Sequence, residues 1–133
     1  MAPRPTPIRS VLQVFALDCP DPPALAAFYA GLLGWRVVED RPDDEWVNVL
    51  PPEHEPQTMK LAFQLVPDHR EPTWPEGDVP QQAHLDFHVP ALAEAAPLAE
   101  AAGARRHPVQ PAEDGSWVVF TDPAGHLFCL CQA

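Results

Sequence analysis

The chain has 133 residues, and a single domain of this length can bury roughly two thirds of the surface that its unfolded chain exposes. With 19 acidic against 8 basic residues, its formal net charge is −11 at pH 7, which would repel the phosphate backbone of a nucleic acid. No apolar run approaches the roughly 20 residues that a membrane-spanning helix needs, so nucleic acid and membrane are both excluded as partners.

The first half of the chain predicts one strand, one helix and three more strands. The alternation in VLQVFALDC (11–19) is typical of a strand. The next stretch has a candidate N-cap in Asp21 and apolar residues at helical spacing up to Gly34, which would end the helix. The three following strands are expected over 35–40, 45–50 and 59–66.

The second half repeats this order of elements. Matching the halves pairs Val14 with His84 and Trp46 with Trp117, and an internal repeat of this kind is strong evidence about a fold. Pro97 falls inside the second helix, where an early turn or a kink would tolerate it. The expected elements are a strand over 84–89, a helix over 91–103 and strands near 104–109, 116–121 and 126–131.

These patterns predict one α+β domain over residues 1–133. It consists of two tandem βαβββ modules, the first over about 11–67 and the second over about 83–132. A proline-rich connector over about 68–82 joins them.

Polar side chains alternate along the first strand of the second module. His84, Asp86 and His88 would share one face of a strand, with apolar residues on the other. Adjacent residues on one face stand about 6.6 Å apart, whereas His84 and His88 are about 13 Å apart, so all three cannot surround one ion. We therefore expect His84 and Asp86 to face a cavity, and His88 to lie near the strand end.

Several motifs resemble the vicinal oxygen chelate superfamily, and within it the glyoxalase-like and bleomycin-resistance-like proteins. The resemblance covers the chain from about Val11 to Gln132. It implies paired βαβββ modules that form a curved mixed sheet around a shared cavity, and a homodimer. The motifs are DCPDPPALAAFYAGLLGW after the first strand, HLDFHV opening the second module, AAGA ending its helix, and FTDPAGHLFCLC.

The resemblance also implies where a metal site would lie. Metal-using members take ligands from the first and last strands of each module, which correspond here to Val14, Gln64, His84 and Cys129. Only His84 matches, because Val14 has no lone pair and Cys129 stands where a carboxylate is usual. We favour a buried apolar role for Cys129 and predict no bound cofactor. If a divalent metal (Zn, Mn, Ni or Fe) binds, its ligands would be His84, Cys129 and Gln64.

Three tryptophans are candidates for the wall of a ligand site. Trp46 and Trp117 occupy equivalent strands of the two modules. Trp74 lies in the connector, where it would either cap the cavity of its own chain or dock on a dimer partner. We expect these tryptophans, with Val14 and Gln64, to bind the ligand.

Three functions remain open at this stage. In the first, the protein binds an apolar or aromatic small molecule between the modules and has an incomplete metal-ligand set. In the alternative, it is a metal-dependent lyase, isomerase or dioxygenase; His84 is then either a general base, with Asp86 or Gln64 orienting the substrate, or a metal ligand together with Cys129. In the third, the chain is an interaction module whose main function lies in its dimer surface. The sequence does not decide between a binding protein and an enzyme, or between modules that pair within one chain and across a dimer.

The cysteines and the N-terminal segment indicate the cellular compartment of the protein. Cys19, Cys129 and Cys131 are an odd number of cysteines, and MAPRPTPIRS has no apolar signal region. We therefore expect a cytoplasmic protein with reduced thiols. His54, His69 and His107 lie among prolines and charges and are predicted to be exposed.

Overall fold

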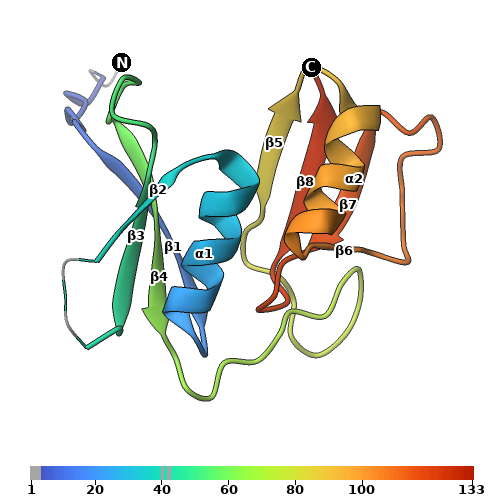
Figure 1. Cartoon of the computed structure of the whole chain (residues 1–133), viewed down its shortest axis with the longest axis horizontal. Helices are drawn as coiled ribbons and strands as arrows, with labels where there is room; N and C mark the ends of the chain where they lie inside the picture. The colour runs from blue at the N-terminus through green and yellow to red at the C-terminus, as the bar shows by residue number, and fades with distance from the viewer. Residues whose placement is uncertain (1–3, 40, 42) are drawn as a thin grey trace.

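A computed structural model of the chain describes residues 4–39, 41 and 43–133. Two βαβββ modules follow one another along the chain, as the sequence predicts (Figure 1). The first contains β1 (Gln13–Cys19), α1 (Pro22–Leu33), β2 (Arg36–Val38), β3 (Trp46–Leu50) and β4 (Met59–Leu65). The second contains β5 (Leu85–Val89), α2 (Leu92–Ala102), β6 (Arg105–Arg106), β7 (Trp117–Thr121) and β8 (Leu127–Gln132).

Each module builds its own four-stranded mixed sheet. The strand orders are β1-β4-β3-β2 and β5-β8-β7-β6, with the first strand of each module parallel to the last. The order is therefore the same in both modules, and the sheets are not closed on each other. One edge of each sheet is consequently the first strand of its module, β1 or β5.

Local signals in the sequence fix the two helices. Asp21 caps α1 by accepting a hydrogen bond from the Ala24 amide, and Gly34 ends it with a left-handed backbone at φ 68°. Gly103 ends α2 at φ 115°. Pro97 lies in the second turn of α2 and does not interrupt it.

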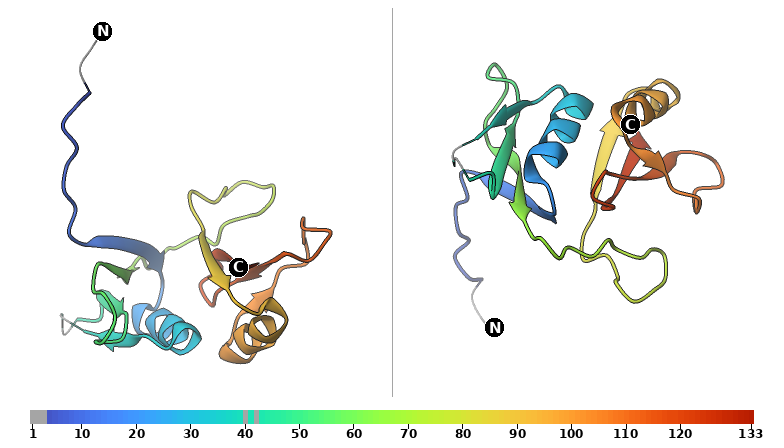
Figure 2. Two further views of the ribbon diagram at one scale, coloured as in Figure 1. Left: turned by 90° about the horizontal axis from the view of Figure 1, so that it is seen from above. Right: turned by 60° about the horizontal axis from the view of Figure 1, so that its bottom comes forward.

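Aromatic side chains join the modules in one core. The two helices lie on the same side of the sheets and contact each other (Figures 1 and 2). Phe28 and Tyr29 of α1 pack against Phe128 of β8, with ring centroids 6.1 and 6.2 Å apart. Tyr29 also stacks on Phe63 of its own module at 5.5 Å. The two modules are thus held together by side-chain contacts of α1 with the second module, and not by a shared sheet.

A buried hydrogen bond crosses the same boundary. The Tyr29 hydroxyl donates to Oδ2 of Asp122 at 2.7 Å, and Asp122 is only 4% exposed. The other carboxylate oxygen accepts from the amides of Ala124 and His126, which shapes the turn between β7 and β8. Burial raises the pKa of Asp122 and also raises that of Tyr29.

Two expected strands are shorter than predicted. The strand expected over 104–109 is reduced to Arg105–Arg106, because the chain turns after His107. Beyond that turn, the side-chain amide of Gln110 accepts a hydrogen bond from the Val119 N–H and donates one to the Val119 carbonyl. These are the backbone groups that a neighbouring strand would otherwise pair with. The strand expected over 35–40 forms over Arg36–Val38, and residue 40 lies outside the described part of the chain.

The segment before β1 and the first half of that strand carry exposed apolar side chains. The segment runs away from both modules in Figure 2. Ile8 is 92% exposed, Val11 72%, and Phe15 on the edge strand itself 47%. No helix in the described residues is long and apolar enough to cross a membrane.

Candidate functional site

The face of the second sheet that points away from α2 brings together three polar side chains. His84 and Asp86 lie two residues apart on one face at the start of β5, and Asp86 is the register partner of Cys129 on β8. The Nε2 atom of His84 lies 3.3 Å from Oδ1 of Asp86. A ligand atom from each of His84, Asp86 and Cys129 lies within 4.8 Å of those of the other two. We call these residues the β5–β8 cluster.

The cluster opens into a surface cavity of about 460 Å³. His88 and Cys131 also line it, so the alternation predicted for residues 84, 86 and 88 places all three on one face. Cys129 is 6% exposed, whereas His84 and Asp86 are exposed. The cluster is therefore a buried thiol flanked by two side chains that solvent reaches.

Burial and charge keep the thiols of this cavity protonated. Burial, together with the Asp86 carboxylate that accepts a hydrogen bond from the thiol, raises the pKa of Cys129 to about 12. Burial and the same carboxylate raise the pKa of Cys131. Neither residue has the lowered pKa that marks a reactive cysteine.

Two of the predicted tryptophans lie beside the cluster. Trp117 and Trp74 both pack on the small apolar group formed by Val119, Leu127 and Cys129. Trp74 packs on its own chain here, with its ring nearly perpendicular to that of His107 and the ring centroids 5.0 Å apart. The connector thus covers part of this face of the second sheet.

A second cavity lies between the modules. It has a volume of about 280 Å³ and is lined mainly by apolar side chains of β1 and of the start of β5. Val14 and His84 both line it, so the structure brings together these equivalent positions of the two modules. Because His84 lines this cavity and the cavity of the cluster, it stands at the border between them.

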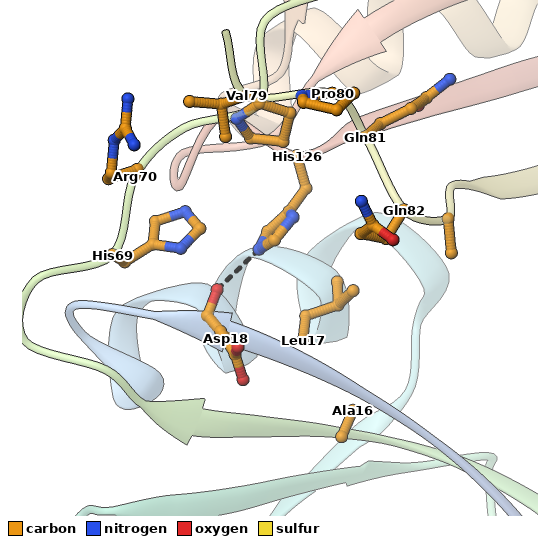
Figure 3. A pocket seen from close by; sticks show the side chains of 12 residues that line it. Ala16, Leu17, Asp18, His69, Arg70, Val79, Pro80, Gln81, Gln82 and His126 are labelled. Atoms are coloured by element: carbon orange, nitrogen blue, oxygen red, sulfur yellow. Dashed lines mark hydrogen bonds between the residues drawn. The ribbon is translucent and has the colours of Figure 1, made fainter.

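Two histidines form the wall of an adjoining cavity of about 300 Å³ (Figure 3). His126 contacts the Asp18 carbonyl through Nε2 at 2.6 Å, and His69 contacts the Ala124 carbonyl through Nε2 at 3.1 Å. Since a carbonyl only accepts, each ring donates its Nε2–H. Their rings lie 4.9 Å apart.

These contacts correct one expectation from the sequence. His69 is half-buried in the contact just described, and His107 is half-buried under Trp74, whereas only His54 is exposed as predicted. The partners of His69 come from the turn between β7 and β8, and the partner of His107 comes from the connector, both distant in the chain. No local pattern in the sequence indicates them.

The remaining predicted residues lie on the first sheet. Trp46 and Gln64 are register partners on β3 and β4, and Gln64 is exposed. The Trp46 indole N–H donates to the buried Asn48 side chain at 2.9 Å, an arrangement that the sequence analysis missed. Among the described residues, neither cavity lined by His84 is also lined by Trp46 or Gln64.

The residues present do not fit the metal site that the resemblance implies. Val14 offers no donor atom, and Gln64 lies on the first sheet outside both cavities of His84 within the described chain. Cys129 supplies sulfur where an oxygen ligand is usual. A site for a hard, oxygen-preferring cation is therefore incomplete within one chain.

Comparison with known proteins gives one family and many similar folds. The family described as glyoxalase-like domain matches residues 14–131. No curated protein gives a significant match.

Three solved structures show the range of related proteins. The fosfomycin resistance protein FosX of Listeria monocytogenes, complexed with Mn(II) and 1S,2S-dihydroxypropylphosphonic acid, superposes with a TM-score of 0.67 at 18% identity, covering 95% of this chain and 94% of its own. TnmS3, an antibiotic binding protein from Streptomyces sp. CB03234, gives 0.62 at 19% identity, covering 96% and 98%. A glyoxalase/dioxygenase from Nostoc punctiforme gives 0.65 at 23% identity, covering 98% and 94%.

Proposed function

Since the chain belongs to the glyoxalase-like domain family, within the vicinal oxygen chelate superfamily, we propose that it binds a small apolar or aromatic molecule between its modules. The observation that carries the proposal is the cavity of about 280 Å³ between β1 and β5. Its walls are mainly apolar, with His84 as a polar group at the border, which is the usual composition of a ligand pocket. Trp117 and Trp74, beside the neighbouring cavity, would extend the binding surface.

An incomplete metal set supports binding rather than chemistry at the family's metal position. The antibiotic binding protein TnmS3 has the same fold, which makes sequestration without turnover a reasonable role for this scaffold. Cys19, Cys129 and Cys131 are all free thiols, which suits the cytoplasm, where we place the protein.

A substitution that fills the cavity tests this proposal. Ala16 lines the cavity from β1 and is exposed, so Ala16→Trp should fill the space without disturbing the core. We expect it to weaken binding of the neutral fluorescent probe N-phenyl-1-naphthylamine by about tenfold or more, because the apolar contact area is lost. His84→Ala should weaken it by less than about threefold, because the histidine only borders the cavity.

Probe fluorescence titrations of the two variants and the wild type check this prediction, and thermal melting confirms that each variant is folded. Equal affinities of wild type and Ala16→Trp would contradict the proposal.

A catalytic role for the same site has one specific observation in its favour. The contact between His84 and Asp86 at 3.3 Å is the geometry of a general base held by a carboxylate. In that case His84 would take a proton from the substrate and Asp86 would orient the imidazole. A turnover that His84→Ala abolishes, with probe binding retained, would favour this alternative.

We further propose that two copies of the chain form a homodimer through the β1 edge. The apolar side chains before and along β1 are unusually exposed for an isolated domain, and an uncovered edge strand invites association. A second copy on this edge would cover them and bring another module next to the cavity. The proposed dimer interface would also cover Val14, which is 42% exposed in the single chain.

Charges introduced beside this edge should separate the copies. Val11 is 72% and Leu12 42% exposed, and both lie outside the inter-module cavity. The double substitution Val11→Lys with Leu12→Lys should convert a dimer to a monomer in sedimentation equilibrium, because two lysines per copy would have to be desolvated. Leu98→Lys, at a 69% exposed position on α2, serves as the matched control and should leave the dimer intact. A monomeric wild-type protein would refute the dimer.

A further inference from the structure

Two cavities between the modules meet at the same side chain. The first is the apolar cavity of about 280 Å³ between β1 and β5. The second is the cavity of about 300 Å³ beside the connector in Figure 3, which we call the connector cavity. The ring of His126 lines both of them, and it extends from the turn between β7 and β8 to β1. There its Nε2–H donates to the Asp18 carbonyl at 2.6 Å, so His126 crosses from the second module to the first where the cavities meet.

We propose that the ring of His126 separates the two cavities and so limits the length of the molecule that the protein binds. The ligand is then a compact apolar or aromatic molecule confined to the apolar cavity, and not an elongated amphiphile whose polar end reaches the connector cavity. This inference rests on the proposed function and adds a class of ligand to it. His126 stands at none of the four positions that the resemblance assigns to metal ligands.

Contacts with three neighbours hold His126 in this place. Its Nε2–H bonds the Asp18 carbonyl, and its backbone N–H bonds the buried Asp122 carboxylate at 3.0 Å. The ring also packs on His69, with centroids 4.9 Å apart, and His69 is itself fixed by its hydrogen bond to the Ala124 carbonyl. Moving the ring aside would break the hydrogen bond between the modules, so the wall between the cavities is already ordered before a ligand binds.

The volumes and the walls on the two sides of His126 favour a compact ligand. Ligand pockets usually have about 300–1,000 Å³, and the apolar cavity of about 280 Å³ reaches only the lower end of this range. Beyond His126, the connector cavity presents polar side chains, among them Arg70 and Gln82. Ala16 and Ala83 line both cavities but end at Cβ, so removing the ring of His126 would join the two spaces.

A series of 1-alkanols of increasing chain length, competing with N-phenyl-1-naphthylamine for the full chain, tests this inference. Each further methylene group that is buried raises the affinity about fourfold, so the affinity rises with chain length until the cavity is full and then levels off. We expect this limit in the wild type, and we expect His126→Ala to move it to longer chains. The longest alkanols should bind His126→Ala about tenfold or more tightly than the wild type, because at least two more methylene groups are buried.

Two matched variants separate the wall from its surroundings. His69→Ala removes the same side chain from the connector cavity alone and leaves the bond between His126 and Asp18 in place, so the wild-type limit should remain. Gln82 is exposed and lines the connector cavity but not the apolar one. Gln82→Trp by itself should leave alkanol binding as in the wild type. Combined with His126→Ala, it should restore the wild-type limit, because it fills the connector cavity. Thermal melting would confirm that each variant is folded.

The outcomes distinguish this inference from the proposed function. If the wild type binds alkanols and a folded His126→Ala shows the same limit, the inference is overturned and the proposed function stands. If His126→Ala does not fold, Gln82→Trp decides by itself. Weaker binding of long alkanols to Gln82→Trp would show that they pass His126 in the wild type and would overturn the inference, whereas unchanged binding would support it. A wild type that binds neither the fluorescent probe nor the alkanols contradicts the proposed function, and this inference with it.

Discussion

Replacing Phe128 with alanine should lower the free energy of unfolding by about 4 kcal/mol, the largest effect that we expect from a single substitution. Phe128 is fully buried, and its ring stacks on Phe120 with centroids 5.4 Å apart. It also packs against Phe28 and Tyr29 from the other module. The substitution would open a cavity where the two modules meet, and domains of this size have only about 5–15 kcal/mol of stability in all.

Urea unfolding followed by circular dichroism would measure this loss. Phe128→Leu keeps most of the volume and is the matched control, for which we expect a loss below about 1.5 kcal/mol. An alanine variant that loses no more than the leucine variant would show that the aromatic contacts between modules contribute little to stability.

Asp122→Ala should be the second most destabilising change, with a loss of about 3 kcal/mol. The substitution removes the bond from Tyr29 and leaves the Ala124 and His126 amides without their acceptor. Tyr29→Phe removes only the cross-module bond and should lose about 1.5 kcal/mol. In a double-mutant cycle the two losses should fall short of additivity by about 1 kcal/mol or more, because both variants lose the same bond. Additive losses would mean that the bond is energetically silent.

The charge on Asp122 adds a dependence on pH. Because burial raises the pKa of Asp122 in the folded protein, ionising this carboxyl favours the unfolded state. The stability that the protonated Asp122 carboxyl contributes is fully present below the pKa of this group in the unfolded chain. That stability is lost as pH rises through the raised pKa of Asp122 in the folded protein. Asp122→Asn keeps an acceptor and does not titrate, so the wild type should gain stability relative to this variant on acidification from pH 7 to about pH 4.

Short-range signals were sufficient to predict the elements. Asp21 and Gly34 mark the two ends of α1, and the alternation from residue 84 to 89 places His84 and Asp86 on one face. These features depend on the backbone of one element, which the sequence within it determines. The internal repeat then supplied the order of elements in the second module from that of the first.

Contacts between different helices and strands could not be predicted from these local patterns. Asp86 meets Cys129 only because β5 pairs with β8, and nothing in either strand specifies that register. The hydrogen bond from the Tyr29 hydroxyl could not be predicted, since its partner Asp122 lies 93 residues further along the chain. His126 likewise lies 108 residues from Asp18, whose carbonyl it contacts. Sites assembled across strands and modules need three-dimensional information.

The separate sheets have a consequence for how the chain is held together. In the part of the chain that the structure describes, each strand ladder lies within one module, and the connector carries no ladder hydrogen bond between the sheets. The two halves are therefore held to each other by side-chain packing in the shared core and by the Tyr29–Asp122 hydrogen bond. The connector then acts as a tether, which sets an effective concentration of the order of mM for their association. A cut in the connector near Gly77 would therefore open neither sheet.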